Sequence, residues 1–261
     1  MKENSRGEIE ALDVRFVTPS QNEKSENFRM KTLTVVSSVV AVAAIGAAVF
    51  VIADGGSDFR ALAAADELLA AGDARSAAGA YRGLIEKGGD ASARARVHLG
   101  VALERQGDLD GSIRALREAA SFGPGAVKAQ AFAYLGYSLY RKGLAEEAVE
   151  AYDRAIEEKI DAFPDVHFNR GVALKKLERH ADAAAALERY ASEAGNGASP
   201  AALLELAEAY FNAERYADCR RNLVEYVKSG PDRESEPRVV ALRTAFDATV
   251  AAAKATRESK P

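Results

Sequence analysis

The chain has 261 residues, of which 48% are hydrophobic and 28% are charged, a composition that is typical of a globular protein and excludes wholesale disorder. The formal net charge of −4 is too small, and of the wrong sign, for a nucleic-acid-binding face. The single cysteine, Cys219, excludes an intrachain disulfide and a cysteine-rich zinc site, so the folded part depends on its core alone.

Residues 1–31 hold six acidic and six basic residues and few apolar ones, which predicts a disordered tail. A short strand or docking peptide around Ile9, Leu12 and Phe16 is the alternative. Residues 32–53 then run for 22 residues without a charge. At about 1.5 Å per residue, a helix of this length spans roughly 33 Å, enough for a bilayer core. We therefore predict a transmembrane helix, with a buried core helix as the alternative.

Charges on either side of this segment predict its orientation. Lys24, Arg29 and Lys31 precede it, whereas Asp54 and Asp58 follow it. The positive-inside bias places residues 1–31 in the cytoplasm and the rest outside, so the expected location is the inner (cytoplasmic) membrane, with a periplasmic C-terminal domain. A signal peptide cleaved after residue 53 is the rival interpretation. The length of the tail and of the apolar run favours an uncleaved signal anchor.

The remainder of the chain repeats itself every 35 or 36 residues. A small residue recurs in register, and a second one follows it twelve residues later: Ala65/Ala77, Gly100/Ser112, Gly136/Ala148, Gly171/Ala183 and Ala207/Cys219. Each half of the repeat has helical periodicity, and short turn sequences separate the halves. After a linker at 54–57, this predicts five helix hairpins over 58–231, with units near 58–92, 93–128, 129–163, 164–199 and 200–233.

The small residues mark the places where the two helices of one unit cross, because only a small side chain lets the backbones approach closely. Large residues are expected to fill the layer between neighbouring units: Tyr81, Leu116, Tyr152, Leu187 and Leu223. One hairpin cannot bury its apolar face alone, but stacked hairpins can. Val239, Leu242 and Phe246 share one face of a further helix at 235–257, which we expect to cap the second helix of the fifth unit.

The repeat resembles that of the tetratricopeptide repeat (TPR) family. The resemblance implies an all-α, right-handed solenoid of about five hairpins with a C-terminal capping helix, preceded here by the transmembrane helix. This sequence departs from the family pattern where an early Trp is usual, a position that holds Ala61, Arg96, Phe132, His167 and Leu203. Arg170 also stands where Leu is usual.

No arrangement of residues indicates catalysis. His98, His167 and His180 lack metal-ligand spacing, and Cys219 occupies a small packing position that suggests a buried, inert thiol. The acidic pairs Asp108/Asp110 and Glu146/Glu147 stand at expected helix starts, where carboxylates favour the helix dipole. We therefore expect no enzyme activity, no cofactor, no metal and no small-molecule substrate.

In the TPR family, first-helix residues that are not used in packing line a concave groove. The resemblance gives the candidate partner-binding residues as Arg94, His98, Arg105, Tyr134, Tyr137, Arg141, Asn169 and Lys176, with Val101 and Val172 beside them. Glu205 and Glu208 are expected to make the C-terminal end of the groove acidic. Tyrosines among basic residues favour a protein or peptide segment of aromatic or acidic character. The Lys/Asn pair that some members use to clamp a C-terminal carboxylate is missing.

Two functions fit this organisation. The first is a membrane-anchored interaction module whose extracytoplasmic groove binds a peptide or an envelope or secretion protein. The second is a structural subunit of a membrane complex, assembled mainly through the transmembrane helix and the tail.

Overall fold

The computed structural model describes residues 56–158, 165–195 and 198–258. The predicted tail at 1–31 and the predicted transmembrane helix at 32–53 lie outside these residues. Within them, no helix has both the length and the apolar character that a membrane crossing requires.

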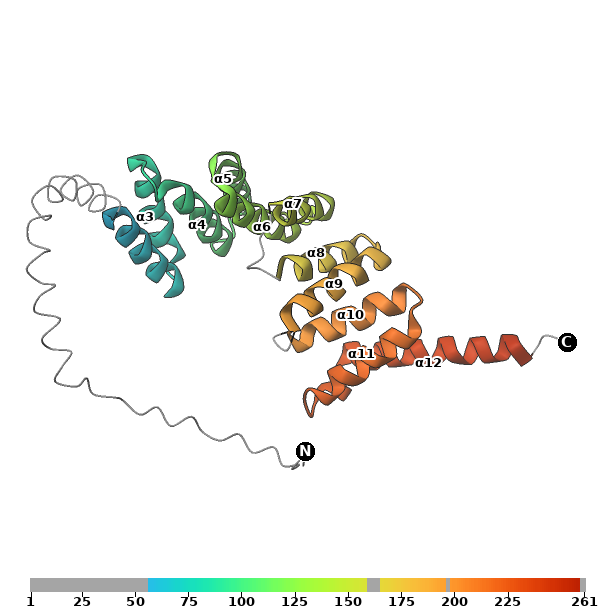
Figure 1. The fold of residues 1–261 in the computed structure, drawn as a ribbon. Coiled ribbons are helices and arrows are strands. Elements are labelled where there is room, and N and C mark those ends of the chain that lie inside the picture. The colour runs from blue at the N-terminus through green and yellow to red at the C-terminus, as the bar shows by residue number, and fades with distance from the viewer. Residues whose placement is uncertain (1–55, 159–164, 196–197, 259–261) are drawn as a thin grey trace, which may run out of the picture. The chain divides into compact units, whose positions relative to one another are not determined.

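The described part of the chain contains eleven α-helices, a short 3₁₀ turn at Arg233–Ser235 and no strand. The helices follow one another as hairpins along the chain (Figure 1). The pairs are 56–70 with α3 (Ala74–Lys87), α4 (Ser92–Arg105) with α5 (Leu109–Phe122), α6 (Gly125–Arg141) with α7 (Ala145–Glu157), α8 (Asp165–Lys176) with α9 (His180–Ala194), and α10 (Pro200–Asn212) with α11 (Tyr216–Lys228). A final helix, α12 (Pro237–Glu258), follows. Residues 56 and 57, assigned to a linker by the sequence pattern, already belong to the first helix.

Aspartate side chains cap the N-termini of the second helices in the first two units. Asp73 accepts a hydrogen bond from the Ser76 backbone N–H at 3.0 Å, and Asp108 accepts one from Gly111 at 2.8 Å. Each caps a backbone group that has no partner within its own helix. Glu146 and Glu147 lie in the first turn of α7. These acidic residues therefore stabilise helix starts.

Glycines let the two helices of a unit touch. An added Cβ at Gly136 would lie 2.6 Å from the Tyr152 ring, and one at Gly100 would lie 2.5 Å from the Leu116 side chain. The large residue of the second helix thus rests on the small residue of the first helix in the same unit. The sequence pattern predicted that the large residues fill the layer between neighbouring units, and this contact within the unit is an addition. Tyr81 also reaches the next unit, where its ring centroid lies 5.6 Å from that of His98.

The other small positions are fully buried, Cys219 among them. Burial raises the pKa of the Cys219 thiol to about 11, as expected of an inert thiol. Leu68 stands three residues after the small residue of its first helix and is exposed, whereas the residues at this position in the later units are buried: Leu103, Leu139, Leu174 and Tyr210. The hydroxyl of Tyr210, which holds this position in the fifth unit, donates a hydrogen bond to Glu188 of the preceding unit. Among the described residues no unit precedes the first, so within them Leu68 has no contact of this kind.

The departures from the family pattern have local partners. Arg170 pairs with Asp153 of α7 at 2.6 Å, so an ion pair to the preceding unit replaces the usual apolar contact. His167 is mostly buried, with its Nε2 3.6 Å from a Glu193 carboxylate oxygen of α9. Burial lowers the pKa of His167, with a smaller opposing effect of Glu193. Both side chains serve packing between helices.

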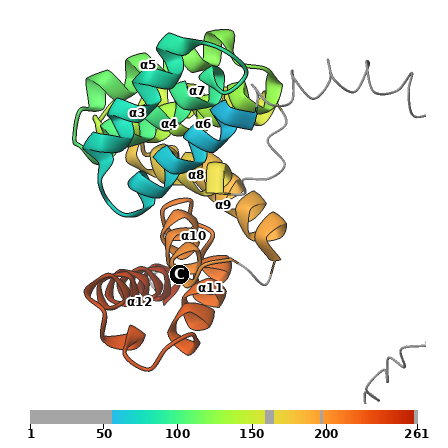
Figure 2. The ribbon, with the colours of Figure 1, turned by 90° about the vertical axis from the view of Figure 1, so that its left-hand side faces the viewer.

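The last helix contacts both helices of the fifth unit. Val239 and Leu242 of α12 are buried in the same core as Leu223, and Phe246 lies against the ring of Tyr216 in α11. In the first turn of α12, Arg238 binds two glutamates of α10, Glu205 and Glu208. The sequence pattern predicted contact with the second helix, and contact with the first is an addition. Figure 2 shows α10, α11 and α12 together.

Candidate functional site

The first helices of units two to four carry the candidate binding residues. Five of these side chains are exposed: Arg94, Arg105, Tyr137, Arg141 and Lys176. Three are half-buried: His98, Tyr134 and Asn169. The helix pairs α4/α6 and α6/α8 contact each other, so these residues lie along one series of neighbouring helices.

Three candidates on α4 bind the first unit. The His98 Nδ1 lies 2.5 Å from Asp66 Oδ1, which also accepts a hydrogen bond from the Tyr81 hydroxyl at 2.6 Å. Arg105 donates to the Leu69 carbonyl at 2.8 Å, and the Arg94 guanidinium lies 5.5 Å from the ring centroid of a neighbouring phenylalanine, Phe59. These side chains tie unit two to unit one. This end of the candidate surface is therefore held mainly by contacts within the chain.

The centre of the surface combines an aromatic ring with a fixed cation. Arg141 forms an ion pair with Glu104 of α4, and its guanidinium lies 5.9 Å from the Tyr137 ring centroid. Hydrogen bonding to Tyr137, followed by the charge of Glu104, raises the pKa of Arg141. The Tyr137 side chain is 37% exposed, a large value for an aromatic residue on a packed helix. An incoming side chain can therefore reach the ring without any rearrangement.

A hollow of about 300 Å³ lies between α6 and α8. Its lining includes three of the predicted residues, Tyr134, Tyr137 and Asn169. The rest of the lining is Gln130 and Ala133 of α6, Tyr152 of α7, and Asp165 and Val166 of α8. The structure thus brings Tyr134 and Tyr137 together with Asn169, and the other five candidates lie outside the lining: Arg94, His98, Arg105, Arg141 and Lys176.

Gln130 and Asp165 were not among the predicted residues, although their positions in the repeat could have identified them. Each stands six residues before the small residue of its first helix, as Arg94 does in unit two. Extending the Arg94 assignment through the repeat would have found both. Tyr152 was recognised as a packing residue, and its contribution to the hollow depends on the space that α6 and α8 leave between them.

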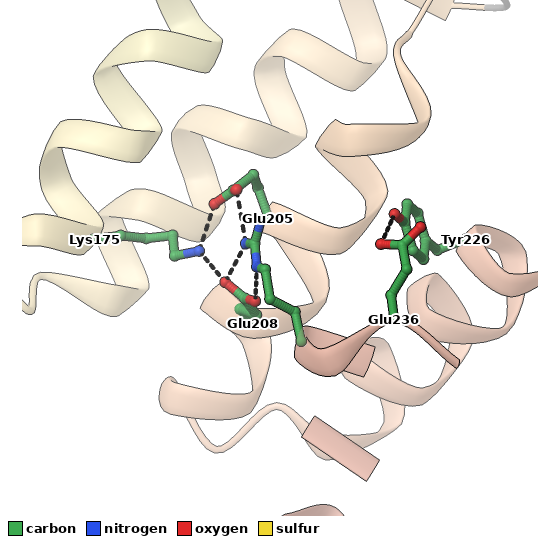
Figure 3. A network of polar contacts seen from close by, with 6 residues as sticks. Lys175, Glu205, Glu208, Tyr226 and Glu236 are labelled. Atoms are coloured by element: carbon green, nitrogen blue, oxygen red, sulfur yellow. Dashed lines mark hydrogen bonds and ion pairs between the residues drawn. The ribbon is translucent and has the colours of Figure 1, made fainter. Parts of the chain in front are cut away.

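The C-terminal end of the surface is not an open acidic region. Lys175 Nζ lies 2.5 Å from carboxylate oxygens of both Glu205 and Glu208, and Arg238 of α12 binds the same two side chains at 2.7 to 2.8 Å (Figure 3). Burial alone would raise the pKa of Glu208, but hydrogen bonds from Arg238 and Lys175 lower it below its usual value. Two cations balance two carboxylates, so the expected acidic end is internally neutralised. The Tyr226 hydroxyl donates a hydrogen bond at 2.6 Å to Glu236, the residue just before α12 (Figure 3).

Comparisons with known proteins agree with this architecture. The family model for the tetratricopeptide repeat matches residues 62–127, 126–167 and 135–199, which together make more than half of the chain. The chain belongs to the tetratricopeptide repeat family. Proteins of this family are generally non-enzymatic interaction scaffolds, and no enzymatic relative is indicated. No curated protein matched the chain.

Solved TPR structures share the fold at low identity. The structure of MamA is 19% identical with a TM-score of 0.53, over 69% of this chain and 93% of that one. The structure of YrrB, described as a TPR protein with an unusual peptide-binding site, is 15% identical with a TM-score of 0.56, over 70% of this chain and 90% of that one. At such identities the likeness concerns the fold alone.

Proposed function

We propose that this TPR protein binds an extended or helical segment of a partner protein along α4, α6 and α8, with the hollow between α6 and α8 at the centre of the contact. The observation that carries the proposal is the group of Tyr134, Tyr137 and Asn169 around that hollow, of which Tyr137 is exposed and the other two are half-buried. Tyrosine and arginine are the residues that most often anchor interfaces. A peptide-binding site in the TPR protein YrrB is consistent with this use of the fold.

Site-specific photocrosslinking tests this proposal. A photoreactive amino acid placed at Tyr137 in the full chain should capture a partner in the native cell, and a partner segment should be identified within the crosslinked product. The matched position is Arg117 of α5, which is exposed and ion-paired with Glu147. The same partner captured equally from both positions, or from Arg117 alone, would place the contact elsewhere than on the first helices.

We further propose that the chain is anchored in the inner membrane by residues 32–53, with the TPR part outside the cytoplasm. The uncharged run of 22 residues and the basic residues before it support this arrangement. Anchoring would raise the effective concentration of the module near membrane partners. Assembly through the span itself is the competing function, and a fragment of residues 1–57 that retained the crosslinked partner would favour it.

A reporter enzyme that is active only in the cytoplasm tests the orientation. Fused after residue 261, it should be inactive, because the basic residues before the span hold the tail inside and place the TPR part outside. The same reporter fused before residue 1 should be active and serves as the control. Activity of the C-terminal fusion would reverse the proposed topology.

A further inference from the structure

Successive first helices of the solenoid are bridged by polar side chains at every step except one. Three of the four steps each join an acidic to a basic side chain: Asp66 with His98, Glu104 with Arg141, and Glu205 with Lys175. The remaining step is from α6 to α8, and between these two helices no described side chains form such a bridge. The hollow of about 300 Å³ lies at this step.

The two helices present polar groups without partners to the hollow. Gln130, Tyr134 and Tyr137 stand at i, i+4 and i+7 of α6, and Asp165 and Asn169 stand at i and i+4 of α8, so each set shares one helix face. Asp165 is exposed and forms no ion pair with any residue that the structure describes. The half-buried side-chain amides of Gln130 and Asn169 have no hydrogen-bond partner among those residues either. A carboxylate and two amide oxygens can therefore accept hydrogen bonds from an occupant.

The lining favours a cationic occupant. Asp165 is the one charged residue among the lining residues, so charge complementarity favours a positive group over a carboxylate. Tyrosine rings also attract cations. Arg141 already lies against the ring of Tyr137, whereas no cation of the described residues lies over the ring of Tyr134.

Among cationic side chains, arginine suits this lining better than lysine. A guanidinium group is planar, stacks on aromatic rings and carries five N–H donors in a fixed arrangement. It can therefore meet a ring, a carboxylate and an amide oxygen together. A lysine ammonium group is compact and strongly hydrated, and does not stack in this way.

We propose that the hollow between α6 and α8 receives one arginine side chain of the bound segment, whose guanidinium group pairs with Asp165 and stacks on the ring of Tyr134. The partner then supplies the basic side chain that the chain itself supplies at the other three steps. This inference rests on the proposed function, because it names a side chain that the bound segment carries. The acidic character expected of that segment concerns the surface outside the hollow, where Lys176 is exposed at the far end of α8.

Capped tripeptides are the probes for the test. Acetyl-Ala-X-Ala-amide, in which X is arginine, citrulline, lysine or glutamate, is titrated into the full chain, and binding is followed by NMR through the side-chain amide signals of Gln130 and Asn169. Citrulline has the shape of arginine without its charge. We expect the arginine peptide to bind about fivefold or more tightly than each of the others. An arginine peptide that bound no more tightly than one of the others, or gave no saturable shift up to about 10 mM, would overturn the proposal.

Two matched variants assign the preference to one carboxylate. Asp165→Asn should bring the arginine and citrulline peptides to within about twofold of each other, because only the ring contact still favours the charge. Glu118→Gln should keep the preference, because Glu118 is an exposed carboxylate of α5, without a partner among the described residues and outside the lining. Circular dichroism shows that both variants keep their helices. A preference that survives Asp165→Asn would contradict the pocket.

Partner capture from Tyr137 distinguishes this inference from the proposed function. A captured segment that contains an arginine, whose replacement by citrulline weakens binding, would support both. A captured segment that contains no arginine would overturn the inference and leave the proposed function standing.

Discussion

Replacing Gly136 by leucine should lower the free energy of unfolding by ~3 kcal/mol or more, because the new side chain has no space at the crossing of α6 and α7. A Cβ alone would lie 2.6 and 2.7 Å from two ring carbons of Tyr152, which is fully buried and cannot turn away. Leucine adds three further carbons to that clash. Gly100→Leu should behave in the same way, since Leu116 faces Gly100 at 2.5 Å. Denaturant unfolding followed by circular dichroism measures both effects.

A glycine outside the crossings provides the control. Gly79 lies in α3, and an added Cβ there would have nothing within 4 Å. Gly79→Ala should therefore stabilise the chain by ~0.5–1 kcal/mol, through the higher helix propensity of alanine. If the midpoint of denaturation were unchanged in both Gly136→Leu and Gly100→Leu, the register of the hairpins described here would be wrong.

The spacing of small residues was sufficient to predict the hairpins, because steric exclusion at a helix crossing constrains the residue type directly. Gly136 and Cys219 show this at two positions, since both are small and both are buried. The same spacing could not reveal that Tyr152 packs inside its own unit. That contact depends on where a long side chain turns once the helices have been placed.

The polar contacts between units were the part that the sequence pattern did not reveal. Glu205 and Glu208 were expected to form an open acidic end, but Lys175 and Arg238 neutralise them. Lys175 faces the next unit, whereas its neighbour Lys176 is exposed. Successive residues of a helix point in directions that differ by about 100°, so two adjacent lysines have different surroundings. Arg238 comes from a helix outside the repeat register, so the repeat pattern could not assign its partners.

The candidate site was predicted only in part, because the repeat pattern does not show which side chains form contacts between units. Tyr134, Tyr137 and Asn169 line the hollow, in agreement with their prediction as binding positions of the first helices. His98 and Arg105 satisfy the same positional rule, yet they bind Asp66 and the Leu69 carbonyl of the first unit. A position in a repeat therefore predicts the direction of a side chain. Whether that side chain is free to bind a partner depends on the residues of the neighbouring unit that it contacts.

Truncating Tyr137 or Arg141 should weaken binding of the partner segment about thirtyfold, or about 2 kcal/mol, without unfolding the chain. Tyr137 is exposed above the hollow, and Arg141 is held over its ring by Glu104, so both can contact an occupant of this surface. Neither side chain contributes to the buried core that stacks the units. The expected loss follows from removing an aromatic platform in one variant and an oriented cation in the other.

The decisive measurement is isothermal titration calorimetry of the photocrosslinked partner segment with wild-type chain, Tyr137→Ala, Arg141→Ala and Arg117→Ala. Arg117→Ala is the matched control, because it removes an exposed arginine that is ion-paired with Glu147 on the second helices. Circular dichroism of each variant confirms that its helices are retained. We predict that Tyr137→Ala and Arg141→Ala each lose about thirtyfold in affinity while Arg117→Ala binds as the wild type does. Full affinity in both folded groove variants would contradict partner binding along α4, α6 and α8.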